Sequence, residues 1–362
     1  MFFKNNLISL NKKQRVTEDV SSYNNCEMIE HFLKEKGGNH VSHLFFLQDK
    51  DFFWTENQKA LIVYKRVFNT IFVLGDPIGE QTEIKNAINE FCQFNRENNL
   101  TPIFYQVSPE YMQYYHESGY RFLKVGEEGI VNLSQFSLEG KKGAKLRTRV
   151  NKFTKNDFTF RVVEPPYSHH FLSELKSISD AWLGNVKEKG FSVVSFSEDY
   201  VSRFPIALLC NAEGKIIAFA TLATNYKHKI TIDLMRKATD SPHGTMDVLF
   251  IHIFNWAKEN GYEHCSLGMS PLSNVGNCKN AFLSEKAIRL VYLYGNSKYN
   301  FRGLKEFKDK FATSWEPKYI AYKKAFLPVM FLQLILLINK KQAIEKNSPD
   351  QTMIQKNEKI AL

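Results

Sequence analysis

The chain has 362 residues, of which 43% are hydrophobic and 14% aromatic, and it carries a net charge of +10. This length favours two domains, and the apolar content excludes a wholly disordered chain. The positive charge favours an anionic partner, either nucleic acid or a phospholipid surface, with a merely soluble basic protein as the alternative. Five isolated cysteines, without a Cys-x-x-Cys pair or a Cys/His cluster, indicate a reducing, cytoplasmic compartment and predict no metal site.

The N-terminal half predicts an α/β unit over residues 23–155, preceded by a flexible tail over 1–22. Its expected elements are a helix over 26–36, strands over 41–48, 52–55, 60–67 and 70–76, a helix over 81–98, a strand over 102–107, a helix over 109–118 and a strand over 122–133. A cationic amphipathic helix over 139–157 closes the unit, because Leu146, Val150 and Phe153 recur at helical spacing among lysines and arginines.

The C-terminal half predicts a second α/β unit over residues 156–340, followed by a disordered polar tail over 341–362. Its expected elements are a strand over 158–166, a helix over 170–183, a hairpin over 206–226, a strand and a helix within 229–249, a strand over 262–272, a helix over 279–289, a strand over 290–295, a helix over 303–310 and a strand over 315–324. The similar order of elements predicts a duplicated α/β (α+β) fold with the substrate cleft between two lobes.

Residues 325–338 are almost wholly apolar and lie between two pairs of lysines. The segment is shorter than the about 20 apolar residues that a membrane-spanning helix needs. Two interpretations stay open: a buried terminal helix, or a helix in the membrane interface whose flanking lysines contact lipid phosphates. The first residues of the chain do not resemble a secretory signal.

Residues 229–249 predict a strand, a short loop and an amphipathic helix, with Asp233 and Arg236 at the end of the strand. Charged residues in an apolar strand are costly unless they pair or act on a ligand, and a helix N-terminus favours negative charge. The segment therefore predicts a site for an anionic or carbonyl-bearing substrate, with a structural Asp–Arg pair as the alternative. Residues three apart in an ideal strand face opposite sides, so joint action requires a bulge or a strand end here.

Several motifs recur together in one known family. They are GDPIGE (75–80), FYQVSPE (104–110), VGEEGIVNLSQFSLEGKK (125–142), SDAWL (179–183), DLMR (233–236), GMSPL (268–272) and YNFRGLKEFKDKF (299–311). From about residue 25 to about residue 340 the chain resembles the C-terminal catalytic domain of bacterial phosphatidylglycerol lysyltransferases, also called lysylphosphatidylglycerol synthases. The resemblance implies two tandem acetyltransferase-like (GNAT) lobes with mixed sheets.

The resemblance also implies an activity. The family transfers an aminoacyl group, here expected to be lysyl, from aminoacyl-tRNA to the glycerol hydroxyl of phosphatidylglycerol, without a cofactor. The lipid becomes less acidic, which confers resistance to cationic antimicrobial peptides. We therefore expect aminoacyl-tRNA and phosphatidylglycerol as partners, and a cytoplasmic protein bound peripherally to the inner face of the cell membrane. The multi-helix flippase region that precedes this domain in the family is not in this sequence, which leaves lipid export and the acceptor open.

The family motifs assign roles to individual residues. Asp233 is expected to position the attacking hydroxyl or the α-amino group, Arg236 to bind phosphate or orient Asp233, and Lys308 to stabilise the oxyanion or bind phosphate. The expected substrate-binding residues are Glu285, for a cationic aminoacyl side chain, and Arg302, Lys305 and Lys310; those for tRNA phosphates are Lys142, Lys145 and Arg147. For the basic residues the alternative is a solvated face, including a Glu306–Lys310 pair.

Three other functions stay open at this stage. One is an aminoacyl-tRNA-dependent transferase with a non-lipid acceptor, such as the amine of a peptidoglycan precursor. Another is a coenzyme A-dependent N-acyltransferase, although the usual glycine-rich pyrophosphate loop is missing around His243 and Gly244. The third is a basic RNA- or membrane-binding module without activity.

Overall fold

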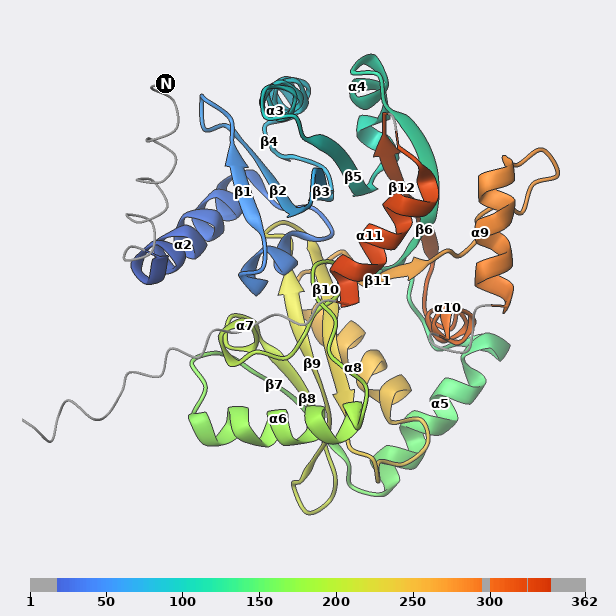
Figure 1. Ribbon diagram of the computed structural model, residues 1–362. Coiled ribbons are helices and arrows are strands. Elements are labelled where there is room, and N and C mark those ends of the chain that lie inside the picture. Colours follow the sequence, from blue (N-terminus) through green and yellow to red (C-terminus); the bar gives the residue numbers. More distant parts are fainter. Residues whose placement is uncertain (1–17, 295–299, 324, 340–362) are drawn as a thin grey trace, which may run out of the picture.

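The computed structural model describes residues 18–294, 300–323 and 325–339 (Figure 1). The tail expected over 341–362 lies outside the described residues. Most of the tail expected over 1–22 does too, and residues 18–22 begin helix α2 (Glu18–Lys36).

One mixed sheet of 12 strands runs through the described residues, and eleven of them follow in the order β1-β2-β3-β5-β12-β6-β11-β10-β9-β8-β7, with β4 beside β2. Their bounds are β1 (Asp51–Trp54), β2 (Ala60–Val67), β3 (Thr70–Leu74), β4 (Ile78–Gly79), β5 (Thr101–Val107), β6 (Arg121–Asn132), β7 (Thr159–Val163), β8 (Ile206–Cys210), β9 (Ile216–Thr224), β10 (Lys229–Lys237), β11 (His264–Pro271) and β12 (Ser314–Tyr322). The predicted mixed α/β class is confirmed.

Strand β12 lies between β5 and β6, antiparallel to both, although it is the last strand of the described residues (Figure 1). Strand β6 in turn pairs with β11, which comes from the C-terminal half. The two halves therefore share one continuous sheet. We keep two lobes that divide near residue 155 as a proposal, in which β12 belongs to the N-terminal lobe by its neighbours.

The helices cover both faces of this sheet. Besides α2 they are α3 (Ile84–Glu97), α4 (Met112–Glu117), α5 (Gly140–Lys155), α6 (His169–Leu183), α7 (Glu198–Val201), α8 (Thr245–Glu259), α9 (Leu283–Tyr294), α10 (Phe301–Lys308) and α11 (Leu327–Asn339), with short 3₁₀ helices η2 (Ser42–Leu47), η3 (Gln81–Glu83) and η4 (Pro109–Tyr111). On one face a single apolar core runs across both halves, under α2, η2, α6, α7 and α11. On the other face the core is divided into one cluster under α3 and α4 and another under α5 and α8.

Two predicted strands are wrong. Residues 42–47, expected to be extended, form η2, all of whose residues are buried. Residues 290–294, also expected to be extended, are the last turns of helix α9. Both segments are short apolar runs, for which residue type alone does not separate a strand from a buried or packed helix. Helix α7, only 4 residues long, was not predicted.

The apolar segment near the C-terminus is helix α11, and it combines features of both interpretations. Met330, Leu334 and Leu337 are buried in the core that spans the two halves. The helix also exposes large apolar side chains, namely Val329, Leu332, Ile335 and Leu336, and Phe326 just before it is exposed as well. Within the described ranges, no helix has both the length and the apolar character needed to cross a membrane.

Gly143 in α5 gives a test of the packing between this helix and the chain before it. A Cβ atom built at Gly143 would overlap the backbone carbonyl of Leu138. Gly-to-Ala substitutions inside helices usually stabilise by up to about 1 kcal/mol. Gly143→Ala should instead destabilise by about 1–3 kcal/mol, because backbone must move to make room. Urea unfolding checks this, with Asn151→Ala on the exposed side of α5 as the control, which should be neutral or slightly stabilising. A stabilised Gly143→Ala protein would contradict the described close approach.

Candidate active site

The site is built where two parallel strands part. Strands β10 and β11 pair from Lys229 and His264 as far as Thr231 and Ser266. Beyond that point both strands are irregular: the register of β10 against β9 shifts between Ile232 and Met235, and that of β11 against β6 shifts between Ser266 and Met269. The bulge that joint action of Asp233 and Arg236 requires is therefore present.

Asp233 lies in the bulge of β10, and groups from both halves of the chain hold its carboxylate. Its Oδ2 accepts a hydrogen bond from the Tyr200 hydroxyl, and its Oδ1 lies 3.4 Å from His43 Nε2. Tyr200 comes from α7, which Ser197 caps by accepting a hydrogen bond from the Tyr200 backbone N–H at 3.2 Å. His43 comes from η2.

The protonation of Tyr200 fits this arrangement. Burial, together with the nearby Asp233 charge, raises the pKa of Tyr200 well above its usual value. The hydroxyl therefore keeps its proton and donates to the carboxylate. The side chain of Asp233 retains 11% exposure, so the carboxylate is held from two sides without being sealed off.

Arg236 is buried beside Asp233, but its contacts go elsewhere. Its Nη2 pairs with Glu188 Oε2 at 3.3 Å, its Nε donates to Ser179 Oγ at 3.1 Å, and its guanidinium lies 4.5 Å from the Trp182 ring centre. Among the described residues no hydrogen bond or ion pair joins Arg236 to Asp233, so the structural Asp–Arg pair considered as an alternative is wrong. The guanidinium fastens α6 and the loop after it to β10.

Lys308 reaches strand β11 from helix α10. It is the last residue of α10, which Asn300 caps by accepting a hydrogen bond from the Gly303 backbone N–H at 2.8 Å. Its Nζ is buried and donates to the carbonyls of Gly268, at 3.0 Å, and Met269, at 2.9 Å, in the bulge of β11. Asp233 therefore lies in the bulge of β10, and the Lys308 amine contacts the bulge of β11, beyond the point where these two strands separate.

Burial lowers the pKa of Lys308 to about 7, although the charge of Glu128 acts in the opposite direction. The amine is therefore only partly protonated at neutral pH, which is unusual for lysine and typical of functional sites.

Glu128 on β6 holds together a cluster that the sequence analysis missed. It is 1% exposed, and its carboxylate lies 2.9 Å from Lys318 Nζ and 3.2 Å from Lys229 Nζ. It also accepts a hydrogen bond from Ser266 Oγ at 2.5 Å. Burial alone would raise its pKa, but Lys318, His40 and Lys229 outweigh that effect and hold the pKa well below its usual value. The sequence did carry a signal for this cluster. Glu127 and Glu128 are charged residues in an otherwise apolar strand, so the reasoning applied to Asp233 applies to them as well.

The four expected substrate-binding residues are spread over different surroundings. Glu285 is half-buried in the first turn of α9, and Arg302 is exposed. Lys305 pairs with Asp309 at 2.6 Å and covers the Trp315 ring at 3.7 Å. Lys310 pairs with Asp247 at 2.8 Å, so the expected Glu306–Lys310 pair is wrong. No hydrogen bond or ion pair of the described residues joins any of the four to Asp233 or Lys308.

Some of the basic side chains on helix α5 are exposed, and others contact neighbouring groups of the protein. Lys142 and Lys145 are exposed and, within the described part of the chain, form no ion pair, whereas Arg147 donates to the carbonyls of Leu138 and Gly140. Arg149, which was not singled out, pairs with Asp247 in the first turn of α8 and lies 3.1 Å from His243 Nε2. The N-terminus of α8 is thus already in contact with a carboxylate and two cations, Arg149 and Lys310.

The sheet order and the parting of β10 from β11 define a mixed α/β protein built on one continuous sheet. The solved structure of FemX shares this fold, with a TM-score of 0.55 at 9% identity over 85% of this chain and 98% of that chain. The family described as "Phosphatidylglycerol lysyltransferase, C-terminal" matches residues 30–322, and the chain belongs to this family.

Individual relatives agree with this assignment. The phosphatidylglycerol lysyltransferase of Bacillus subtilis (strain 168) is 43% identical over 309 residues, which are 85% of this chain and 36% of the relative. The structure of L-PGS from Bacillus licheniformis is 44% identical, with a TM-score of 0.78 over 87% of this chain and 97% of that chain. This chain thus spans about a third of the length of the curated relatives it matches.

Replacing Glu128 tests the buried cluster. Glu128→Gln removes the buried counter-charge of Lys229 and leaves Lys318 with only the half-exposed Glu316, and it should destabilise the fold by about 3–5 kcal/mol at pH 7. Because the pKa of Glu128 is depressed by folding, its stabilisation is complete above the unfolded value of 4.5 and is lost as pH falls through the folded value. The difference in free energy of unfolding between the unmodified chain and Glu128→Gln, measured by urea unfolding, should therefore narrow below about pH 4.5.

The matched control is Glu316→Gln, because Glu316 also contacts Lys318, at 3.4 Å, but is half exposed. It should cost at most about 1 kcal/mol. Equal effects of the two substitutions would show that the buried carboxylate has no special role.

Proposed function

We propose that this chain transfers a lysyl group from lysyl-tRNA to the glycerol hydroxyl of phosphatidylglycerol. The observation that carries the proposal is a held carboxylate in the bulge of β10 and a buried amine on the bulge of β11, just beyond the point where these strands part, in a chain of the phosphatidylglycerol lysyltransferase C-terminal family. The relative from B. subtilis bears the name of this activity.

The reaction is a transesterification that needs no external energy source. The lipid hydroxyl oxygen bonds to the ester carbonyl carbon, the bond from that carbon to the ribose oxygen breaks, and the hydroxyl proton ends on the ribose oxygen. We assign to Asp233 the positioning of the attacking hydroxyl, or of the α-amino group of the donor, since its carboxylate is fixed by Tyr200 and His43. Lys308, in its protonated form, stabilises the oxyanion.

Arg236 receives a positioning role in this proposal. Its charge is balanced by Glu188 and its guanidinium is covered by Trp182, so it is poorly placed to take up a phosphate as well. It holds the segment around Ser179 and Glu188 against the bulge that carries Asp233.

The substrates are large anions, and the surface offers separate places for them. Lys142 and Lys145 on α5 suit tRNA phosphates, with Arg147 contributing less because it already contacts backbone carbonyls. Arg302 is exposed and forms no ion pair with the other residues that the structure describes, so it suits a further phosphate contact. Lys305, Lys310 and Glu285 act from positions on or beside α10 and α9. The exposed apolar side of α11 supports peripheral binding to the inner face of the membrane.

Coenzyme A as the donor is disfavoured by the N-terminus of α8. Acetyltransferases of this fold bind the pyrophosphate at such a helix N-terminus, where backbone N–H groups face the anion. Here Asp247 places its own carboxylate in that first turn, paired with Arg149 and Lys310. A pyrophosphate would have to displace a buried acidic group.

The test incubates the full chain with tRNA charged with labelled lysine and with phosphatidylglycerol vesicles, followed by lipid extraction and mass spectrometry. Lysylated phosphatidylglycerol is the expected product. Asp233→Asn should lower its formation by about 10²–10⁴-fold, while tRNA binding stays within about twofold. Asp240→Asn, which alters an exposed aspartate of the same segment, is the control and should keep full activity. Label confined to a non-lipid product would refute the lipid acceptor.

The buried amine predicts a pH dependence. Because kcat/KM reports the free enzyme and the pKa of Lys308 is lowered to about 7, kcat/KM should fall as pH rises through about 7. Lys308→Arg keeps its charge at all these pH values, so its kcat/KM should be lower but should lack this decline. The rate is measured after subtraction of spontaneous ester hydrolysis. A kcat/KM that rises through pH 7 and loses this rise in Lys308→Arg would instead make Lys308 a proton acceptor.

A further inference from the structure

Helix α9 is unusually exposed for a helix in a folded protein. Ile288 is its one fully buried residue. Large apolar side chains point to solvent along its length, among them Leu283, which is 83% exposed, Leu290, which is 59% exposed, and Tyr294, which is 79% exposed. Phe282 just before the helix is also exposed. Exposed apolar groups gathered on one element mark a surface that contacts another body.

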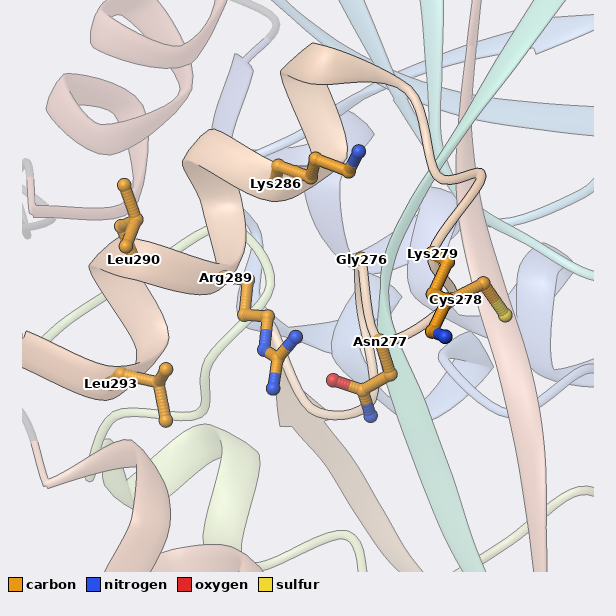
Figure 2. Close-up of a pocket in the computed structure, with 8 residues that line it drawn as sticks. All are labelled: Gly276, Asn277, Cys278, Lys279, Lys286, Arg289, Leu290 and Leu293. Carbon is orange, nitrogen blue, oxygen red and sulfur yellow. The ribbon is translucent and has the colours of Figure 1, made fainter.

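Basic side chains border the same surface. A pocket of about 470 Å³ lies between α9 and the loop over 276–279, and Lys279, Lys286 and Arg289 line it (Figure 2). The Arg289 guanidinium and the Asn277 amide point toward one another across this pocket (Figure 2). The lining contains no acidic residue, and no ion pair occupies any of these three cations in the described part of the chain.

We propose that α9 and the loop over 276–279 form a docking surface for the anionic face of a phospholipid membrane. Lys279, Lys286 and Arg289 contact lipid phosphates, and Leu283 and Leu290 enter the boundary between headgroups and acyl chains. The proposal deepens the proposed function and rests on it for the choice of lipid, because it brings the protein to the surface where its acceptor resides.

The combination of charge and apolar surface favours lipid over RNA. Phosphate contacts of RNA require cations but bury no aliphatic side chains, whereas interfacial helices need both. Helix α5 provides the comparison within the same molecule. Its exposed face carries Lys142, Lys145 and other cations, and no large apolar side chain of its described residues is exposed. The two basic surfaces therefore differ in chemistry, one suited to tRNA and the other to a membrane.

Helix α11 reinforces this surface. Ile288 of α9 and Met330, Leu334 and Leu337 of α11 belong to the same apolar core, with α9 at the right-hand edge of the molecule and α11 nearer its centre (Figure 1). Each turns further apolar side chains away from that core. Stable membrane binding generally requires two contacts, such as an apolar insertion and a basic patch. Helix α9 supplies a basic patch together with apolar side chains that can enter the membrane, and α11 supplies a second set of such apolar side chains.

The experiment measures co-sedimentation of the full chain with vesicles of equal parts phosphatidylglycerol and phosphatidylcholine. Combined Lys279→Gln, Lys286→Gln and Arg289→Gln should lower the partition coefficient on the order of 100-fold at low salt, as expected for three surface cations. The control removes the same charge from α5 by Lys141→Gln, Lys152→Gln and Lys155→Gln, and should change vesicle binding by less than about threefold. Leu283→Ser with Leu290→Ser should lower binding about tenfold even at high salt, where charges are screened.

Three outcomes would overturn the proposal. Equal losses in the α9 and α5 triple variants would show unspecific attraction by net charge. The α9 triple variant could instead lose binding to tRNA without an attached amino acid, measured by gel shift, while its vesicle binding stays intact. That result would assign the surface to RNA. A dimer in sedimentation velocity that the α9 variants dissociate would assign it to a second copy of the chain. Unchanged thermal unfolding of every variant serves as the folding control.

Vesicle binding and transfer activity are separable in this design. If the unmodified chain binds vesicles through α9 but lysylates no lipid, even short-chain phosphatidylglycerol dispersed without vesicles, the proposed function fails and the docking surface stands. If it lysylates dispersed lipid and the α9 triple variant still binds vesicles like the unmodified chain, the docking surface fails and the proposed function stands.

Discussion

The structure depends on one buried carboxylate. Glu128 on β6 is approached by Lys318 from β12, Lys229 from β10 and Ser266 from β11. These four strands are consecutive in the sheet, in the order β12-β6-β11-β10, and they include the junction between the two halves of the chain. A charge of this kind is stable in the interior only when its partners are fixed in place. The cluster therefore sets the relative position of the two halves at the level where the candidate site lies.

The site inherits its geometry from this junction. Strands β10 and β11 are held together next to the cluster and part immediately beyond it, so that Asp233 lies in the bulge of one strand and Lys308 contacts the bulge of the other. His43 reaches Asp233 from the N-terminal half. A site assembled in this way is incomplete in either half alone.

The sequence predicted regular elements well and the partners of charged residues poorly. The helices α5 and α6 were predictable from periodicity, since each buries one apolar face, and β2 from its apolar run, whose first four residues are buried. Segment 42–47 was not, because a run buried on all sides carries no period. Asp233 was predicted from its charge in an apolar strand and Lys308 from the family motifs, whereas Tyr200, His43 and Glu128 were not singled out. Their importance arises from contacts between residues far apart in the chain, which local pattern does not encode.

The position of β12 has a consequence for biosynthesis. Strands β5 and β6 lie on either side of β12, so the sheet of the N-terminal half keeps a gap until residues 314–322 have left the ribosome. Until then both strands present unpaired backbone groups, which invite pairing with other chains. The sheet of the N-terminal half therefore cannot be completed before β12 has been synthesised. Such long-range closure is slow, and it makes the growing chain a natural client for chaperones that shield strand edges.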